Sequence, residues 1–182
     1  MRPDWPLETE RLVLRPFAEG DLDALYAMHS DGDVVRYLYN EPRSYDETNE
    51  LLDRKIDGAE LNAVGGWLSA AVVLRESGRV VGDVVLQWVS EVHRTGEIGF
   101  VFDPAAQGRG YATEASRAFL RVAFEDFGLH RVIGRTEVRN VASARVLEKL
   151  GMRREAHLVE NEWVKGEWQS ELVYALLDRE WR

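Results

Sequence analysis

Hydrophobic residues recur along the chain at two different spacings, which divide it into candidate strands and helices. A short apolar run, Leu12–Leu14, lies between Arg11 and Arg15, and Arg11–Arg15 is predicted to be a first strand. Residues 21–29 carry apolar side chains at helical spacing and predict a helix. Ser44 and Glu47 have the spacing of a capping box, so a second helix is expected to begin there.

Strand-forming residues dominate the middle of the chain. β-branched and aromatic residues are dense in three runs, Trp67–Leu74, Val80–Val89 and Gly96–Phe102, which predicts an antiparallel meander. Helical spacing returns over Ala112–Phe127, and Gly128 stands where the carboxyl-terminal cap of that helix would lie.

The last third of the chain contains both spacings. A short strand is predicted over Arg131–Thr136, followed by a helix that Asn140 can cap and that runs to Leu150. Two further strands, Arg154–Val164 and Glu167–Leu177, flank a Lys-Gly pair typical of a hairpin turn. Strands with helices inserted late indicate an α/β fold built on a mixed sheet.

Length and composition bound the architecture. With 182 residues, 45 % of them hydrophobic, residues 1–182 are expected to form a single domain with its own core. No apolar run approaches the ~20 residues of a membrane-spanning helix, and Met1–Glu10 lacks the pattern of a signal peptide, so a soluble cytoplasmic protein is expected. The absence of cysteine excludes disulfides, thiolate metal sites and a cysteine nucleophile.

The charge balance narrows the class of partner. The chain has 23 Lys and Arg residues against 32 Asp and Glu residues, a net charge of −9. Nucleic acid and anionic membranes are therefore not expected as partners, whereas a cationic substrate would be attracted. The four histidines lack the spacing of a metal site, so no metal is expected.

One loop, Asp103–Thr113, carries chemistry that can be read from the sequence. Pro104 has no N–H and ends the preceding strand, while Gly108 and Gly110 let the backbone turn its N–H groups into one concavity. This arrangement suits a pyrophosphate, although a tight turn alone would need the same glycines. A Walker loop is excluded because Gly-Lys-Ser/Thr is missing, and a Rossmann fingerprint because Thr113 replaces the third glycine.

Several segments resemble one family. Gln107–Ala112 matches the Gln/Arg-x-x-Gly-x-Gly/Ala acyl-CoA signature of the GNAT superfamily of N-acyltransferases. Thr9–Arg15 is similar to the opening strand of its RimJ/RimL-like branch, the ribosomal-protein N-terminal acetyltransferase type, and Glu97–Phe100 is similar to the fourth strand. Asn140–Met152 resembles the last helix of that branch. The chain is therefore identified, by resemblance, as a GNAT enzyme.

The resemblance implies a fold and a mechanism. The fold is a largely antiparallel sheet of about seven strands with splayed central strands and about four helices. Acetyl-CoA is the implied co-substrate, and an amine attacks its thioester directly in a ternary complex. Pantetheine pairs with the fourth strand and the pyrophosphate lies on the glycine loop. The implied coenzyme A contacts are Phe100, Val101, Phe102, Gln107, Gly108, Arg109, Gly110, Tyr111, Ala112 and Thr113.

The last helix departs from the commoner family pattern. Many relatives have a Tyr seven places after the helix-starting Asn, where it protonates the departing thiolate, but this chain has Leu147 there. Ser143 matches the RimJ/RimL-like branch instead, so Asn140 is implied to contact pantetheine and Ser143 to act near the sulfur. Helix capping by Asn140 would explain the same residues. Arg145 and Lys149 are candidates for the phosphates or for a solvated helix face.

A candidate base lies on the predicted strand Gly96–Phe102. Its side chains alternate, so Glu97 shares one face with Gly99 while the other face is apolar. Gly99 leaves open space beside Glu97, which is placed to accept a proton from an incoming ammonium. Two alternatives stay open: Glu97 only anchors a neighbouring Arg or backbone group, or the base is Glu160 or Glu162.

These observations favour acetyl transfer from acetyl-CoA to a primary amine. The acceptor can be a protein N-terminus, an aminoglycoside-like drug, a polyamine or an amino acid. Two alternatives are a non-catalytic CoA-binding sensor, which the missing Tyr favours, and an enzyme with a longer donor such as succinyl-CoA. The apolar terminal hairpin offers a surface for a homodimer. A wide groove would favour a peptide acceptor, and a closed acidic pocket a small cationic amine.

Overall fold

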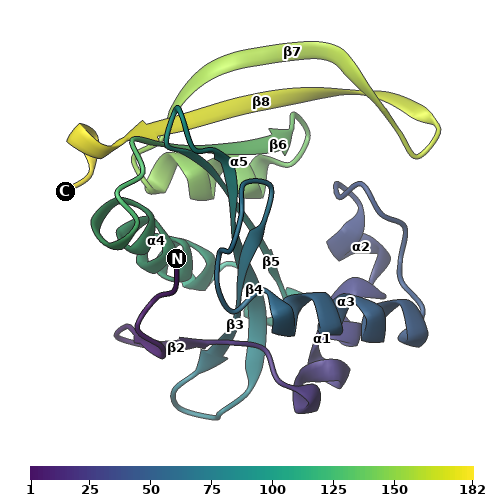
Figure 1. Cartoon of the computed structure of the whole chain (residues 1–182). Helices are drawn as coiled ribbons and strands as arrows, with labels where there is room; N and C mark the ends of the chain where they lie inside the picture. Colours follow the sequence, from purple (N-terminus) through teal and green to yellow (C-terminus); the bar gives the residue numbers. More distant parts are fainter.

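A single eight-stranded sheet forms the centre of the molecule, in the order β1-β2-β3-β4-β5-β6-β8-β7 (Figure 1). The computed structural model describes residues 1–182. All neighbouring strands are antiparallel except β5 and β6. The strands are β1 (Leu7–Glu8), β2 (Leu12–Arg15), β3 (Trp67–Leu74), β4 (Val80–Ser90), β5 (Thr95–Phe102), β6 (Arg131–Glu137), β7 (Arg153–Val164) and β8 (Glu167–Leu177).

The expected mixed, largely antiparallel sheet is confirmed, with one strand more than the seven predicted. The extra strand is β1, which has only two residues and pairs with β2 through Leu7 and Glu8. A strand this short shows no alternation, so its pattern could not be recognised in the sequence.

The two central strands diverge. β5 and β6 pair only over Thr95–Glu97 and Arg131–Ile133. Beyond Glu97, β5 continues to Phe102 beside β4, while β6 continues to Glu137 beside β8. The predicted splay is thus confirmed. It leaves one edge of each strand unpaired and opens a cleft in the middle of the sheet.

Helices cover both faces of the sheet (Figure 1). α1 and α3 pack against β3 and β4 on one face, and α4 and α5 lie together on the other. There are five α-helices where about four were predicted, because Asp31 caps an additional single turn, α2. The helices are α1 (Leu22–His29), α2 (Gly32–Val35), α3 (Tyr45–Asp57), α4 (Tyr111–Arg121) and α5 (Val141–Lys149).

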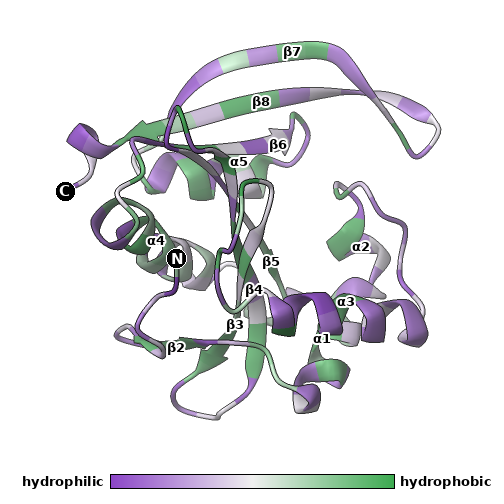
Figure 2. Ribbon diagram, viewed as in Figure 1, coloured by the Kyte–Doolittle hydropathy of each residue, from purple (hydrophilic) through white to green (hydrophobic).

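Local signals in the sequence set several of these boundaries. The predicted capping box at the start of α3 is present, since the Ser44 hydroxyl accepts from the Glu47 N–H and the Glu47 carboxylate accepts from the Ser44 N–H. α3 is mostly hydrophilic, as Figure 2 shows, so only a thin apolar stripe reaches the sheet. The predicted helix to Phe127 is instead α4 followed by a wider π-helical turn, Val122–Asp126. No helix is both long and apolar enough to span a membrane.

The main core lies between the sheet and the α4–α5 side. It contains 28 buried residues, among them Ile98 and Phe102 of β5. The predicted alternation along β5 is therefore present, with Glu97 on the opposite face. A smaller cluster of five buried residues holds α1 and α3 to the sheet. The main core thus holds both central strands through Ile98, Phe102 and Val132, and β5 also packs through Val101 against the smaller cluster.

Candidate active site

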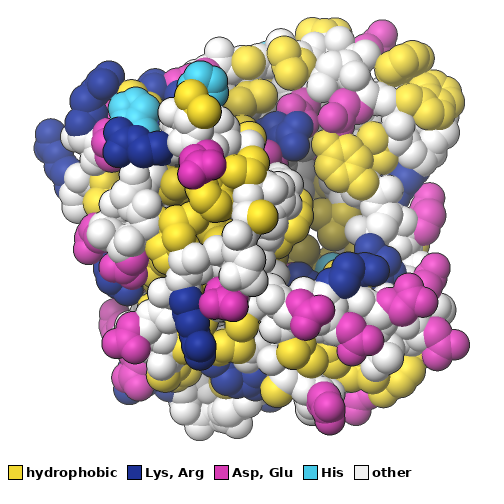
Figure 3. Space-filling view, in the orientation of Figure 1, with side chains coloured by type: hydrophobic (Ala, Val, Ile, Leu, Met, Phe, Trp, Pro, Cys, Tyr) yellow, Lys and Arg dark blue, Asp and Glu magenta, His cyan; other side chains and the backbone are white.

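A cavity of about 150 Å³ occupies the cleft between β5 and β6. Its walls also include the segment Tyr37–Tyr39 and residues of the β7–β8 hairpin. Figure 3 shows the face of the molecule hollowed between this hairpin and α3, with charged side chains around the hollow. Segments more than a hundred residues apart in sequence therefore meet at one site.

The loop after β5 has the geometry of an anion site. Asp103 caps a short 3₁₀ turn, Pro104–Ala106, by accepting from the Ala105 N–H at 2.8 Å. Gly108 and Gly110 then adopt left-handed backbone angles, with φ of +74° and +82°, which a side chain would disfavour. These two residues turn the chain into α4.

A row of backbone donors results. None of the N–H groups from Gly108 to Thr113 donates a hydrogen bond within the protein. Glu114 is the first residue whose N–H joins the helix, and it bonds to the Gly110 carbonyl at 3.0 Å. Free amides at the start of an 11-residue helix, together with its dipole, attract an anionic oxygen. The loop fits the pyrophosphate of coenzyme A.

The predicted cofactor contacts differ in what they offer. The side-chain amide of Gln107 is turned back to the strand and donates through its Nε2 to the Phe102 carbonyl at 3.0 Å, so it shapes the loop. The side chain of Phe102 is buried in the core, and that of Phe100 lines the cavity. Val101 pairs with Asp83 of β4.

Basic side chains surround the start of α4. Arg109 is exposed on the loop, and Lys149 lines a shallow depression beside it together with Arg117. Arg117 was not predicted, because the helical turn that brings it alongside the loop is not visible as a motif. Arg145 is exposed on α5 and lies outside that depression.

The start of α5 faces the cavity. Asn140 accepts the Ser143 N–H at 3.1 Å, so it does cap the helix, while its own side-chain NH₂ group stays free. Both residues line the cavity, and the Ser143 hydroxyl makes no hydrogen bond within the protein. Leu147 is buried and packs against Gly134. Apolar packing therefore fills the place where many relatives carry a Tyr.

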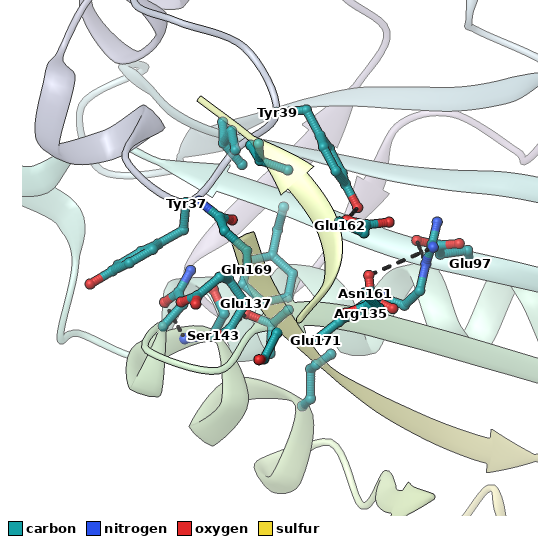
Figure 4. A pocket seen from close by; sticks show the side chains of 18 of the residues that line it. Tyr37, Tyr39, Glu97, Arg135, Glu137, Ser143, Asn161, Glu162, Gln169 and Glu171 are labelled. Atoms are coloured by element: carbon teal, nitrogen blue, oxygen red, sulfur yellow. Dashed lines mark hydrogen bonds and ion pairs between the residues drawn. The ribbon is translucent and has the colours of Figure 1, made fainter. Parts of the chain in front are cut away.

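Carboxylates and one guanidinium form the opposite wall (Figure 4). The Arg135 Nε donates to Glu97 Oε1 at 3.0 Å, and its Nη1 lies 3.7 Å from Glu171 Oε2. Tyr39 donates its hydroxyl to Glu162 at 2.6 Å across the cleft. Glu97 and Glu171 are 16 % and 7 % exposed in their side chains, so their charges are poorly hydrated. Three carboxylates of this wall face a single cation, while Glu137, the fourth carboxylate of the cavity lining, pairs with Arg139 at 2.8 Å.

The close approach of these charges shifts the pKa values of the side chains in the wall. Burial raises the pKa of Glu171, and the charges of Glu162 and Glu97 raise it further, while Arg135 opposes them. The hydrogen bond to Glu97 raises the pKa of Arg135. Desolvation of its hydroxyl and the bond to Glu162 raise the pKa of Tyr39, so its hydroxyl stays protonated. A cation entering the cavity would relieve the repulsion among the carboxylates.

The three candidate bases are placed differently. Glu97 is the last residue of β5 that pairs with β6, so it lies where the cleft opens. Glu162 lies on the cavity wall. Glu160 sits in a bulge of β7 with φ of +47°, exposed and outside the cavity lining. Glu171 is an acidic wall residue that the sequence did not single out. No group of three His, Cys, Asp or Glu side chains is arranged to hold a metal ion.

Comparison with known proteins agrees with this geometry. Residues 11–153 match the acetyltransferase (GNAT) domain family. The chain is 34 % identical to the uncharacterized N-acetyltransferase YnaD of Bacillus subtilis, over 96 % of this chain and 98 % of that protein. The crystal structure of a GNAT-family acetyltransferase from Bacillus anthracis superposes with a TM-score of 0.86 at 32 % identity, covering 96 % and 99 % of the two chains.

A third relative is informative about ligands. The spermidine N-acetyltransferase of Vibrio cholerae, solved in complex with CoA and spermine, has a TM-score of 0.81 at 26 % identity, covering 95 % of this chain and 99 % of that one. The chain therefore belongs to the GNAT acetyltransferase family. It is an acyltransferase, and acetyl-CoA is its co-substrate.

Proposed function

We propose that this enzyme acetylates a primary amine of a small cationic molecule. The observation that carries the proposal is the acidic wall, where Glu97, Glu162 and Glu171 line the cavity and Arg135 is the one cation of the lining. A partly enclosed cavity with excess negative charge favours an ammonium group. The V. cholerae relative, crystallised with spermine, supports an acceptor with more than one positive charge.

The donor lies along the divergent edge of β5. Its pyrophosphate accepts hydrogen bonds from the amides of Gly108 to Ala112, since those N–H groups lack partners in the protein, whereas the Gln107 N–H already donates to the Pro104 carbonyl at 3.2 Å. The pantetheine arm pairs with the backbone of Phe100–Phe102, and the free NH₂ group of Asn140 donates to one of its carbonyls. This placement brings the thioester to the cavity that holds the acceptor.

The reaction proceeds by direct attack. Glu97 accepts a proton from the acceptor ammonium, directly or through a water, and frees the lone pair of the amine. The amine nitrogen bonds to the thioester carbonyl carbon, and the carbon–sulfur bond breaks. The amine nitrogen gives up its second proton as the amide forms, and Ser143 passes a proton to the departing sulfur and regains one from that nitrogen, directly or through a bridging water, because its hydroxyl has no other partner. The products are an N-acetyl amine and coenzyme A.

A thiol-release assay with an acceptor panel tests the proposal. The panel contains a monoamine, a diamine, a triamine, an amino acid and a peptide with a free N-terminus, each with acetyl-CoA and with succinyl-CoA. The highest kcat/KM is expected for acetyl-CoA with the di- or triamine. Tight CoA binding without turnover of any acceptor would contradict the proposal and indicate a sensor, and faster turnover with succinyl-CoA would indicate a longer donor.

A second candidate acceptor is a protein N-terminus. The resemblance of Thr9–Arg15 and of the Asn140-x-x-Ser143 spacing to the RimJ/RimL-like branch favours it. The peptide in the panel distinguishes the two acceptors, since a small enclosed acidic site should accept the diamine and exclude the longer chain.

A further inference from the structure

One carboxylate ties the pyrophosphate loop to a distant strand. Glu114, in the first turn of α4, accepts from the Thr9 hydroxyl at 2.6 Å and from the Arg11 N–H at 2.9 Å. The Arg11 side chain adds a forked contact to the other carboxylate oxygen, with Nε at 2.7 Å and Nη2 at 2.6 Å. Four donors from the segment before β2 therefore converge on one side chain more than a hundred residues away.

The same arginine reaches the loop itself. Arg11 Nη1 donates to the Arg109 carbonyl at 2.9 Å, and its guanidinium lies 4.7 Å from the centre of the Tyr111 ring. In a trans peptide the C=O and the next N–H point in opposite directions. Holding the Arg109 carbonyl against Arg11 therefore turns the Gly110 N–H away from Arg11, among the free amides of the loop.

Electrostatics require this contact as well. A free carboxylate in the first turn of α4 would repel a pyrophosphate bound at the same helix end. Burial alone would raise the pKa of Glu114, but the hydrogen bonds from Thr9 and Arg11 lower it, so the group is ionised at neutral pH. The guanidinium of Arg11 neutralises that charge next to the anion site.

We propose that Thr9, Arg11 and Glu114 form a clamp that positions the pyrophosphate loop for the donor. The inference rests on the proposed placement of the pyrophosphate. None of the three residues needs to touch acetyl-CoA, because they act through the Arg109–Gly110 peptide. The clamp should therefore matter only for donors that carry a pyrophosphate.

Two donors separate this role from a general structural one. Acetyl-CoA carries the pyrophosphate, and S-acetylpantetheine presents the same thioester without it. Arg11→Lys keeps the charge but cannot form the fork and reach the carbonyl together, so kcat/KM for acetyl-CoA should fall about tenfold, mostly through KM. The rate with S-acetylpantetheine and the KM of the amine should stay unchanged. Thr9→Val should lower kcat/KM for acetyl-CoA about threefold and leave the rate with S-acetylpantetheine unchanged.

A matched control is an arginine of α4, the helix that carries Glu114. Arg121 is 43 % exposed, close to the 44 % of Arg11, and pairs with Asp126 at the far end of α4. Arg121→Lys should leave the rates with acetyl-CoA and with S-acetylpantetheine unchanged. Equal losses with both donors, or no loss with acetyl-CoA, in Arg11→Lys and Thr9→Val would overturn the clamp. If the wild-type enzyme used both donors with the same kcat/KM, the placement of the pyrophosphate would itself be wrong.

Discussion

The proposed donor end of the cleft, the Gln107–Ala112 loop, and the proposed acceptor end, the acidic wall, would recognise opposite charges by different means. The proposed donor end is one continuous loop, which offers unpaired backbone amides and two left-handed glycines. The acceptor end is made of side chains, from Tyr39 to Glu171, contributed by four strands and a loop. An anion can be held by the backbone because every residue except proline carries an N–H group, whereas a cation at this site needs carboxylates brought together by the fold.

The largest expected effect is at the donor end. Gly110→Val places a β-branched residue at φ of +82° and brings its Cβ to 3.4 Å from Arg11, so acetyl-CoA affinity should fall by about 100-fold or more in calorimetry. Gly78→Val is the control, since Gly78 has a φ of +68° in the β3–β4 turn with open space around it. Unchanged affinity in Gly110→Val would remove the loop as the pyrophosphate site.

The second effect lies where the two ends meet. Ser143→Ala removes a hydroxyl that has no other partner, and kcat should fall by roughly 100-fold with little change in acetyl-CoA affinity. Ser143→Thr keeps a hydroxyl at the same place and should retain most of the rate. Wild-type kcat in the alanine variant would leave Ser143 as a helix residue only.

More residues of the proposed donor end than of the proposed acceptor end could be selected from the sequence, for a physical reason. The loop from Gln107 to Ala112 is contiguous, and the residue types that it needs are set by local backbone geometry. Arg135 and Glu171 become neighbours of Glu97 only through the pairing of β5 with β6 and of β6 with β8. A sequence read alone does not give that register, so neither side chain could be assigned to the wall.

The elements of the fold also differ in how well the sequence predicted them. Periodicity and caps located the longer strands and helices, because those patterns extend over many residues. β1 and α2 were missed, since two- and four-residue elements carry too little pattern. Glu162 was a candidate base from the sequence. Its contact with Tyr39 joins residues 123 positions apart and depends on where the β7–β8 hairpin lies, which the sequence does not give.

The third effect tests the base at the acceptor end. Glu97→Gln keeps the shape of the side chain and removes its ability to accept a proton, so kcat/KM should fall by about tenfold or more at low pH, where the amine is protonated. The deficit should shrink as pH approaches the pKa of the amine. Glu162→Gln is the matched swap and should raise the KM of the acceptor without this pH dependence. Wild-type rates in Glu97→Gln across the range would move the search to Glu162 and Glu171.

The smallest effect concerns charge recognition by Glu171. Its pKa is raised by burial and by its acidic neighbours, so on acidification it loses its charge at a higher pH than an ordinary glutamate does. The wild-type KM for a diamine should therefore rise as pH falls toward that raised pKa, and a monoamine should show a weaker rise. Glu171→Gln should raise the diamine KM by about fivefold at neutral pH, the equivalent of about 1 kcal/mol, and should flatten its pH dependence. An unchanged pH profile in that variant would show that another group at the acceptor end titrates, and would reduce the acidic wall to Glu97 and Glu162.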